Sequence, residues 1–325
     1  MKKMKLLSGM RSTGLLLIFA VSLLLAPQAA TAQQDPMYSQ YMFNQQVLNP
    51  AYAGSWGYLT STMIYRKQWV GINGAPQTGS FSFHAPSKND QHGFGLSFVN
   101  DRIGITQTNG LSAAYAFRIH LGEHARLALG LQGSLDNYRA NFGSVRTGST
   151  IDPSSVGLDP SFNGNSINSW LPNAGAGLFF HTRYFYLGGS TPKLVLHRLS
   201  GDNSASLSAQ SRHFFFTTGV VLGKEESFLK FKPSILVKYV PGTRVQFDFN
   251  AHVLLADRIW LGASFRTEDA VVFMTQIQAL QWLRLGYAFD YVTSELSTYG
   301  NASHEFMLGF DLNFKRKSMI SPRYF

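Results

Sequence analysis

Residues 245–253 of the chain are VQFDFNAHV, in which apolar and polar side chains alternate strictly. The odd-numbered positions carry Val, Phe, Phe, Ala and Val, and the even-numbered positions carry Gln, Asp, Asn and His. Successive side chains of a β-strand point to opposite faces. The stretch therefore predicts a strand with one apolar and one polar face.

The same alternation recurs along most of the chain. Residues 283–291 and 306–314 repeat it with several aromatic side chains on the apolar side. A strand that crosses a membrane in a β-barrel needs about 9–11 residues with this alternation. We therefore predict an all-β fold, a transmembrane antiparallel β-barrel of about 14 strands, at residues 58–66, 77–84, 93–99, 110–120, 126–136, 173–180, 184–190, 213–222, 228–239, 244–255, 258–266, 270–278, 282–291 and 303–314.

The connections between these strands differ in length by parity. If the first strand rises from the periplasm, one set faces outside and is mostly long: 67–76, 100–109, 137–172, 191–212, 240–243, 267–269 and 292–302. The other set is nearly all short: 85–92, 121–125, 181–183, 223–227, 256–257 and 279–281. Long outer loops and short periplasmic turns are typical of a cell outer-membrane barrel.

A secreted β-sandwich is the alternative, because its strands also bury one face. The apolar faces here are broad and aromatic, and the polar faces carry Gly130, Gly286 and Gly309, which favours a crowded lumen. Charges of both signs on the polar faces indicate an interior hydrogen-bonded network rather than an ion funnel. The residues predicted to face the lumen include Arg118, Lys230, Lys232, Lys238, Asp248, Arg266, Arg284, Asp290, Glu305 and Asp311.

The composition excludes several classes of protein. The chain has 325 residues, 45% of them hydrophobic, which rules out disorder over most of its length. It has no Cys, so neither a disulfide scaffold nor a Cys-ligated zinc site is available. Charged residues make up 14%, and the net charge is +10. A mean hydropathy of −0.05 is too polar for a helical membrane bundle.

The first residues predict two segments ahead of the barrel. Residues 1–32 have a basic start, an apolar run at 15–26 and a small-residue site at 30–32, which indicates a signal peptide rather than an uncleaved anchor. In residues 33–57, Asp35-Pro36 predicts a helix start and Asn49-Pro50 its end. We expect a helix of about three turns that plugs the barrel or docks on a periplasmic partner; a frayed leader is the alternative.

The sequence carries no recognisable catalytic motif. The nine His are scattered, and no HExxH, P-loop or GxSxG occurs. We therefore expect no enzyme, no cofactor and no metal. A hydrolase on a barrel stays an alternative, because Ser, His and Asp can converge in space, and a porin-like barrel for a small solute is another.

Several segments resemble one family. They are residues 34–44 (QDPMYSQYMFN), 49–55 (NPAYAGS), 66–71 (RKQWVG), 95–102 (GLSFVNDR) and 321–325 (SPRYF). Together they resemble the PorP/SprF family of the type IX secretion and gliding machinery of Bacteroidetes. The resemblance implies a non-enzymatic outer-membrane component in contact with outer-membrane lipid. The predicted export signal argues against nucleic acid as a partner. The resemblance also implies protein partners: a periplasmic ring and its lipoprotein, a peptidoglycan-binding linker protein, and exported cargo with a C-terminal sorting domain.

The resemblance offers no catalytic residues, only candidates for partner binding: Arg66, Trp69, Asp101, Arg102, Arg323 and Phe325. The connection 137–172, rich in Ser, Gly and Asn, is a candidate for cargo specificity. Residues 58–314 are expected to form the barrel and 315–325 a basic tail. That tail either continues the last strand, reaches a periplasmic partner or caps the barrel beside the membrane.

Overall fold

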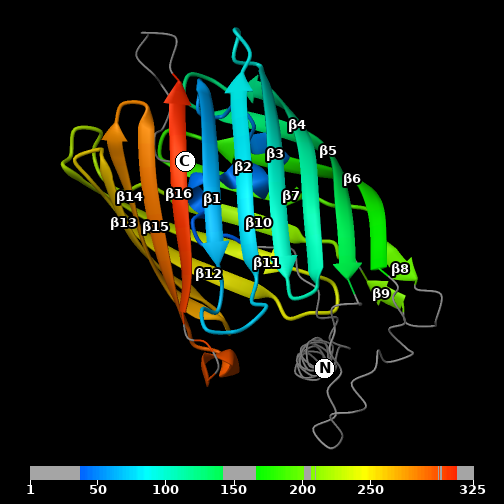
Figure 1. Cartoon of the computed structure of the whole chain (residues 1–325). Helices are drawn as coiled ribbons and strands as arrows, with labels where there is room; N and C mark the ends of the chain where they lie inside the picture. Colours follow the sequence, from blue (N-terminus) through cyan, green and yellow to red (C-terminus); the bar gives the residue numbers. More distant parts are fainter. Residues whose placement is uncertain are drawn as a thin grey trace, which may run out of the picture. The chain divides into compact units, whose positions relative to one another are not determined.

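The chain folds into a closed antiparallel β-barrel of fourteen strands (Figure 1). This computed structural model describes residues 37–141, 166–200, 206–208, 210–298, 300 and 302–312. The barrel strands are β1 (Leu59–Lys67), β2 (Gln77–Pro86), β3 (His92–Ile103), β4 (Thr106–His120), β5 (Arg126–Asn141), β6 (Ser166–His181), β7 (Phe185–Thr191), β10 (Phe214–Val220), β11 (Leu229–Tyr239), β12 (Gln246–Leu255), β13 (Ile259–Arg266), β14 (Ala270–Leu280), β15 (Leu283–Val292) and β16 (Ala302–Leu312). Pairing of β1 with β16 closes the cylinder.

Each of the fourteen predicted strands is present, so the predicted fold class is confirmed. The sequence prediction was wrong about the length of two connections. Most of 100–109 is strand, because β3 and β4 pair up to Ile103 and Thr106 around a turn at Gly104, whose φ is +55°. Likewise β5 and β6 extend to Asn141 and from Ser166, so both ends of 137–172 are strand. In these strands the backbone pairing continues beyond the residues with alternating apolar side chains, into a part of each strand where most side chains are polar.

The connection between β7 and β10 holds a small two-stranded ladder of β8 (Arg198–Ser200) and β9 (Ser206–Ser208), which the sequence did not predict. The barrel has two ends that differ in their connections. We call the end with 68–76, 104–105, 192–213, 240–245, 267–269 and 293–301 the long-loop end. The opposite, short-turn end has 87–91, 121–125, 182–184, 221–228, 256–258 and 281–282. In Figure 1 the β2–β3 connection marks the short-turn end at the top, and η7 (Glu295–Thr298) the long-loop end.

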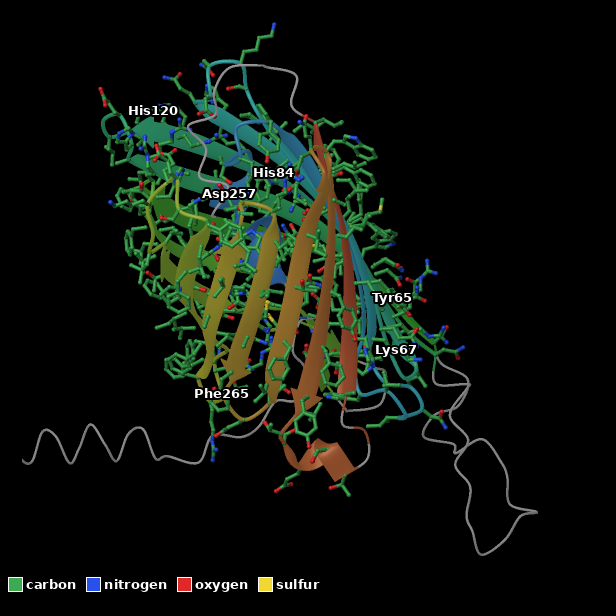
Figure 2. All side chains as sticks on the ribbon, turned by 90° about the vertical axis from the view of Figure 1, so that its left-hand side faces the viewer. Tyr65, Lys67, His84, His120, Asp257 and Phe265 are labelled. Carbon is green, nitrogen blue, oxygen red and sulfur yellow. The ribbon has the colours of Figure 1, made fainter. Side chains whose placement is uncertain are left out.

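The alternating side chains sort to the two sides of the wall as predicted. In β12, Phe247 and Phe249 are 38% and 47% exposed on the outside, whereas Asp248 between them is 2% exposed. Figure 2 shows Tyr65, Lys67 and Phe265 on the outside and His84 within. All ten charged residues predicted to face the lumen are buried: Arg118, Lys230, Lys232, Lys238, Asp248, Arg266, Arg284, Asp290, Glu305 and Asp311.

Residues 37–57, which we call the plug segment, lie within the barrel and are mostly buried. The predicted single helix is wrong: three short 3-10 turns are present instead, η1 (Tyr41–Phe43), η2 (Gln45–Val47) and η3 (Pro50–Tyr52). Pro50 begins the last turn rather than ending a helix, because the Asn49 side chain accepts a hydrogen bond from the Ala51 amide and caps it.

No helix among the described residues is long and apolar enough to cross a membrane. The predicted signal peptide (1–32) and basic tail (315–325) lie outside the described residues, as do residues 142–165 of the connection between β5 and β6.

Candidate functional site

The lumen wall is shaped to the plug segment by glycine. A Cβ on Gly93 would overlap the carbonyl oxygen of Ala53, and one on Gly130 would overlap the backbone of Ala51. Both contacts are with plug backbone, so neither is relieved by the rotation of a side chain. Glycine is therefore required at these two positions, where the plug backbone lies directly against the wall.

At the long-loop end, Glu305 of β16 holds the start of the plug. Its carboxylate accepts from the backbone amides of Ser39 and Gln40 at 2.7 and 2.8 Å. Arg66 of β1 pairs with the same carboxylate at 3.0 Å and with Asp290 of β15 at 2.7 Å. The Ser39 hydroxyl donates to Asp290 at 2.7 Å and also contacts Arg66. All four side chains are buried, and the ion pairs and plug groups partner most of their polar atoms. Among the described residues, Arg66 Nε and Asp290 Oδ1 have no hydrogen-bond partner.

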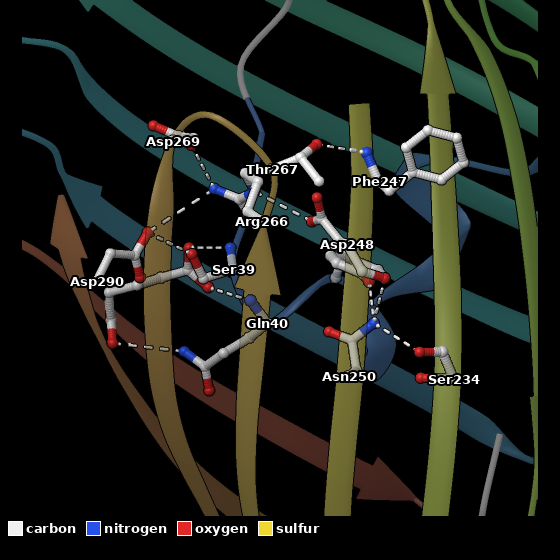
Figure 3. A network of polar contacts seen from close by, with 12 residues as sticks. Ser39, Gln40, Ser234, Phe247, Asp248, Asn250, Arg266, Thr267, Asp269 and Asp290 are labelled. Atoms are coloured by element: carbon white, nitrogen blue, oxygen red, sulfur yellow. Dashed lines mark hydrogen bonds and ion pairs between the residues drawn. The ribbon is translucent and has the colours of Figure 1, made fainter. Parts of the chain in front are cut away.

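A second arginine extends this network around the lumen (Figure 3). Arg266 of β13 contacts Asp248 and Asp269, each at 3.1 Å, and lies 3.9 Å from Asp290. Beside Asp248 on β12, the Asn250 amide donates to the Tyr41 hydroxyl of the plug at 2.7 Å. Polar groups of five barrel strands (β1, β12, β13, β15 and β16) and of the plug therefore form one connected network, whose hydrogen bonds are strengthened by the low dielectric of the interior.

At the short-turn end, Arg118 of β4 holds the end of the plug. Its guanidinium donates to the carbonyl of Gly54 at 2.7 Å and to that of Ala53 at 3.3 Å. Asp90, in the β2–β3 turn, is its counter-ion at 2.7 Å. On β2, which β3 separates from β4, the His84 ring accepts from the Gly54 amide at 3.0 Å.

The last plug residues pack against a third arginine. The Arg284 guanidinium lies over the Trp56 ring, 4.4 Å from its centroid, and pairs with Asp311 at 2.9 Å. The plug therefore runs from the long-loop end to the short-turn end, held at both ends by charged side chains of the wall. The chain's own backbone therefore occupies part of the lumen at these contacts.

The residues predicted to bind a partner fall in different places. Arg66 and Asp101 face the lumen and are buried; Arg66 holds the plug, and Asp101 accepts from Thr78 at 2.6 Å. Trp69 lies in the β1–β2 connection with φ +44°, and Arg102 is exposed on the outside of β3. Arg323 and Phe325 lie outside the described residues. A partner-binding role for these six residues stays a prediction.

The sequence did not reveal that Ser39, Gln40 and Gly54 are the wall's main targets in the plug. The alternation of side chains alone identified Glu305 and Arg118, the wall residues that hold these plug groups, and Arg284, which packs on Trp56. Within the described ranges, no three His, Cys, Asp or Glu side chains gather as a metal site requires.

A closed barrel with an apolar aromatic exterior and a polar filled interior is an integral outer-membrane protein. A family model described as "Type IX secretion system membrane protein PorP/SprF" matches residues 30–310. The chain therefore belongs to the PorP/SprF family of type IX secretion membrane proteins, as the sequence motifs predicted.

No curated protein matches the chain. Similar solved structures include Omp33 of Acinetobacter baumannii, with 10% identity and a TM-score of 0.44 over 78% of this chain and 98% of that one. The toluene transporter TbuX of Ralstonia pickettii has 11% identity and a TM-score of 0.48 over 89% and 97%. The monoaromatic hydrocarbon channel CymD has 10% identity and a TM-score of 0.49 over 87% and 94%. Likenesses at these values carry no functional argument.

Proposed function

We propose that this barrel is a non-enzymatic docking component of the type IX machinery rather than a solute channel. The observation that carries the proposal is the plug, which is held at Ser39 by Glu305 and at Gly54 by Arg118 while glycines admit its backbone. A porin-like role requires a continuous water path. If the lumen is filled and its charges are paired, the surfaces left for binding partners are the two ends of the barrel and their connections.

In this proposal the long-loop end faces outside and docks or anchors exported proteins with C-terminal sorting domains. The short-turn end faces the periplasmic ring, its lipoprotein and the peptidoglycan-binding linker protein. Support comes from the length difference between the two sets of connections. Support for the partners comes from the family to which the chain belongs.

Orientation is tested directly because the chain has no Cys. Two exposed residues are suitable for single cysteine substitutions: Val70 in the β1–β2 connection and Lys224 in the β10–β11 connection. On intact cells a membrane-impermeant maleimide is expected to label V70C and not K224C, and both after lysis. The reverse pattern overturns the proposed orientation.

Docking is tested by a photo-crosslinking amino acid at Val70, at Leu222 of the short-turn end, and at Phe273 on the outside of β14. We expect an exported protein with a C-terminal sorting domain at Val70 and a ring component at Leu222. The lipid-facing Phe273, 55% exposed, serves as control and is expected to capture neither. Capture of neither class at both rims contradicts the docking role.

The solute-channel alternative is decided by conductance in planar bilayers. The full barrel is expected to be silent, and a variant lacking residues 37–57 to conduct. If the full barrel conducts as well as the variant that lacks residues 37–57, the porin-like function is favoured instead.

A further inference from the structure

We propose that the outer face of β1–β6 at the long-loop end carries a binding site for a membrane glycolipid with a phosphorylated sugar head group. The feature behind this proposal is a band of side chains that the strand register aligns across six neighbouring strands. It goes beyond docking of secretion partners, and it rests on the proposed outward orientation of the long-loop end.

Three successive outward-facing rows change from apolar to cationic toward the long-loop end. The first row is wholly apolar and continues the lipid-facing surface: Met63, Phe81, Phe98, Leu111, Leu135 and Pro172. The second row is Tyr65, Gly79, Asn100, Asn109, Asn137 and Trp170. The third, which we call the cationic row, is Lys67, Gln77, Arg102, Gln107, Arg139 and Asn168.

Position argues for a lipid head group as the occupant. Four residues along a strand span about 13 Å, so the cationic row lies one head-group depth beyond side chains that contact acyl chains. The row is therefore continuous with the lipid-facing surface. A ligand that reaches both rows has an apolar part and an anionic part.

Charge argues for phosphate. The three cations stand on alternate strands, β1, β3 and β5, about 10 Å apart from one another. Lys67, Arg102 and Arg139 are all exposed, and no Asp or Glu is among the described outward-facing residues of β1–β6. Within the described part of the chain, no carboxylate forms an ion pair with Lys67, Arg102 or Arg139. Arginine binds phosphate oxygens through paired N–H groups, and alternating cations suit a head group with more than one phosphate.

The residues between the cations argue for a sugar. Gln77, Gln107 and Asn168 offer amide donors and acceptors that match hydroxyl groups. In the second row Asn100 donates to Asn109 at 2.6 Å. Asn137, itself only 2% exposed, donates to Asn168 of the cationic row and accepts from Arg139 Nε, both at 2.7 Å, so it holds these two exposed side chains in place. Trp170 ends this row with 63% of its surface exposed, which leaves an aromatic face for a sugar ring. A simple phospholipid head group uses the cations but not these groups.

The test measures lipid binding by the purified full-length barrel in zwitterionic nanodiscs, with native mass spectrometry as readout. The probes are diphosphorylated lipid A, its dephosphorylated form and phosphatidylglycerol. We expect diphosphorylated lipid A to bind at least tenfold more tightly than either of the others. Equal binding of phosphatidylglycerol overturns the sugar-phosphate assignment.

Matched variants separate the row from general charge. Each cation beside an anionic head group contributes about fivefold, so K67Q/R102Q/R139Q is expected to weaken lipid A binding about a hundredfold. The control R183Q/K224Q/R258Q removes the same charge at the short-turn end and is expected to bind normally. K67R/R102K/R139K keeps the charges and is expected to bind more tightly than the Gln variant but less tightly than the wild-type barrel, because lysine lacks the paired N–H groups of arginine. The same gel shift on heating as the wild-type barrel shows that the Gln variant is folded. Unchanged binding by the Gln variant overturns the proposal directly. Failure of the V70C labelling test instead removes the outward orientation on which the proposal rests, and the two failures are distinguished because lipid binding in nanodiscs does not depend on orientation in the cell.

Discussion

The attachment of the plug at Glu305 gives the sharpest prediction. The Glu305→Ala substitution removes the acceptor of the Ser39 and Gln40 amides, which lie 2.7 and 2.8 Å from the carboxylate. Arg66 keeps Asp290 at 2.7 Å, so the wall retains one of its two ion pairs. The substitution therefore weakens the attachment of the plug more than it weakens the barrel.

The magnitude follows from the burial of the group. Glu305 is fully buried, and its carboxylate makes two charge-assisted bonds to the plug, each of roughly 1.5–3 kcal/mol. The ion pair between Arg66 and Glu305 joins two wall residues, so only the two bonds to the plug bear on its opening. We expect the free energy of opening the plug to fall by about 3–6 kcal/mol, which raises the population of the open plug by roughly two to four orders of magnitude.

The assay is amide hydrogen exchange of residues 38–48 in the folded barrel, with peptides of β11–β14 as internal reference. Glu268→Ala is the matched control, because Glu268 forms an exposed pair with Arg244 that contributes little. The reasoning is refuted if exchange of residues 38–48 stays at the wild-type rate. It is equally refuted if the reference strands speed up as much as the plug.

Three further predictions concern the wall. Gly130→Leu puts a side chain into the Ala51 backbone, so it is expected to displace the plug and produce conductance in planar bilayers, unlike Gly133→Leu, whose Cβ meets no neighbour. Arg118→Ala removes the donor to Ala53 and Gly54 and is expected to speed amide exchange at the plug's end more than at Ser39. Phe273→Arg places a charge in the lipid-facing surface and is expected to lower the unfolding free energy in urea by about 2–4 kcal/mol, against no more than about 1 kcal/mol for Phe273→Leu.

Local pattern was sufficient to predict the barrel. Period-two alternation assigned Phe247 to the outside and Asp248 to the inside before any contact was known, because strand geometry alone fixes the side on which each residue lies. The strand prediction failed where the alternation of apolar and polar side chains stopped. Residues 100–109 look like a loop because, apart from Ile103 and Ile105, they are polar or glycine on both faces, yet backbone pairing continues there.

The plug segment shows the other failure. Asn49 is extended, with φ −134° and ψ 111°, as the steric restriction on a residue before proline requires, so the failure concerns the continuous helix expected ahead of it. In the lumen, the polar groups of residues 37–57 find partners on the wall, so short turns replace a continuous helix. Contacts with Gly93 and Gly130 select that path, and neither glycine is adjacent to the plug in sequence.

The sequence by itself determined the number of strands, the two faces of each, and which charges point inward. Only the tertiary structure decided that Ser39 meets Glu305, 266 positions away, and that Lys67, Arg102 and Arg139 stand in one row. The reason is physical: side-chain direction depends on the local backbone, whereas partners across a closed sheet depend on register and closure. These are properties of all fourteen strands together.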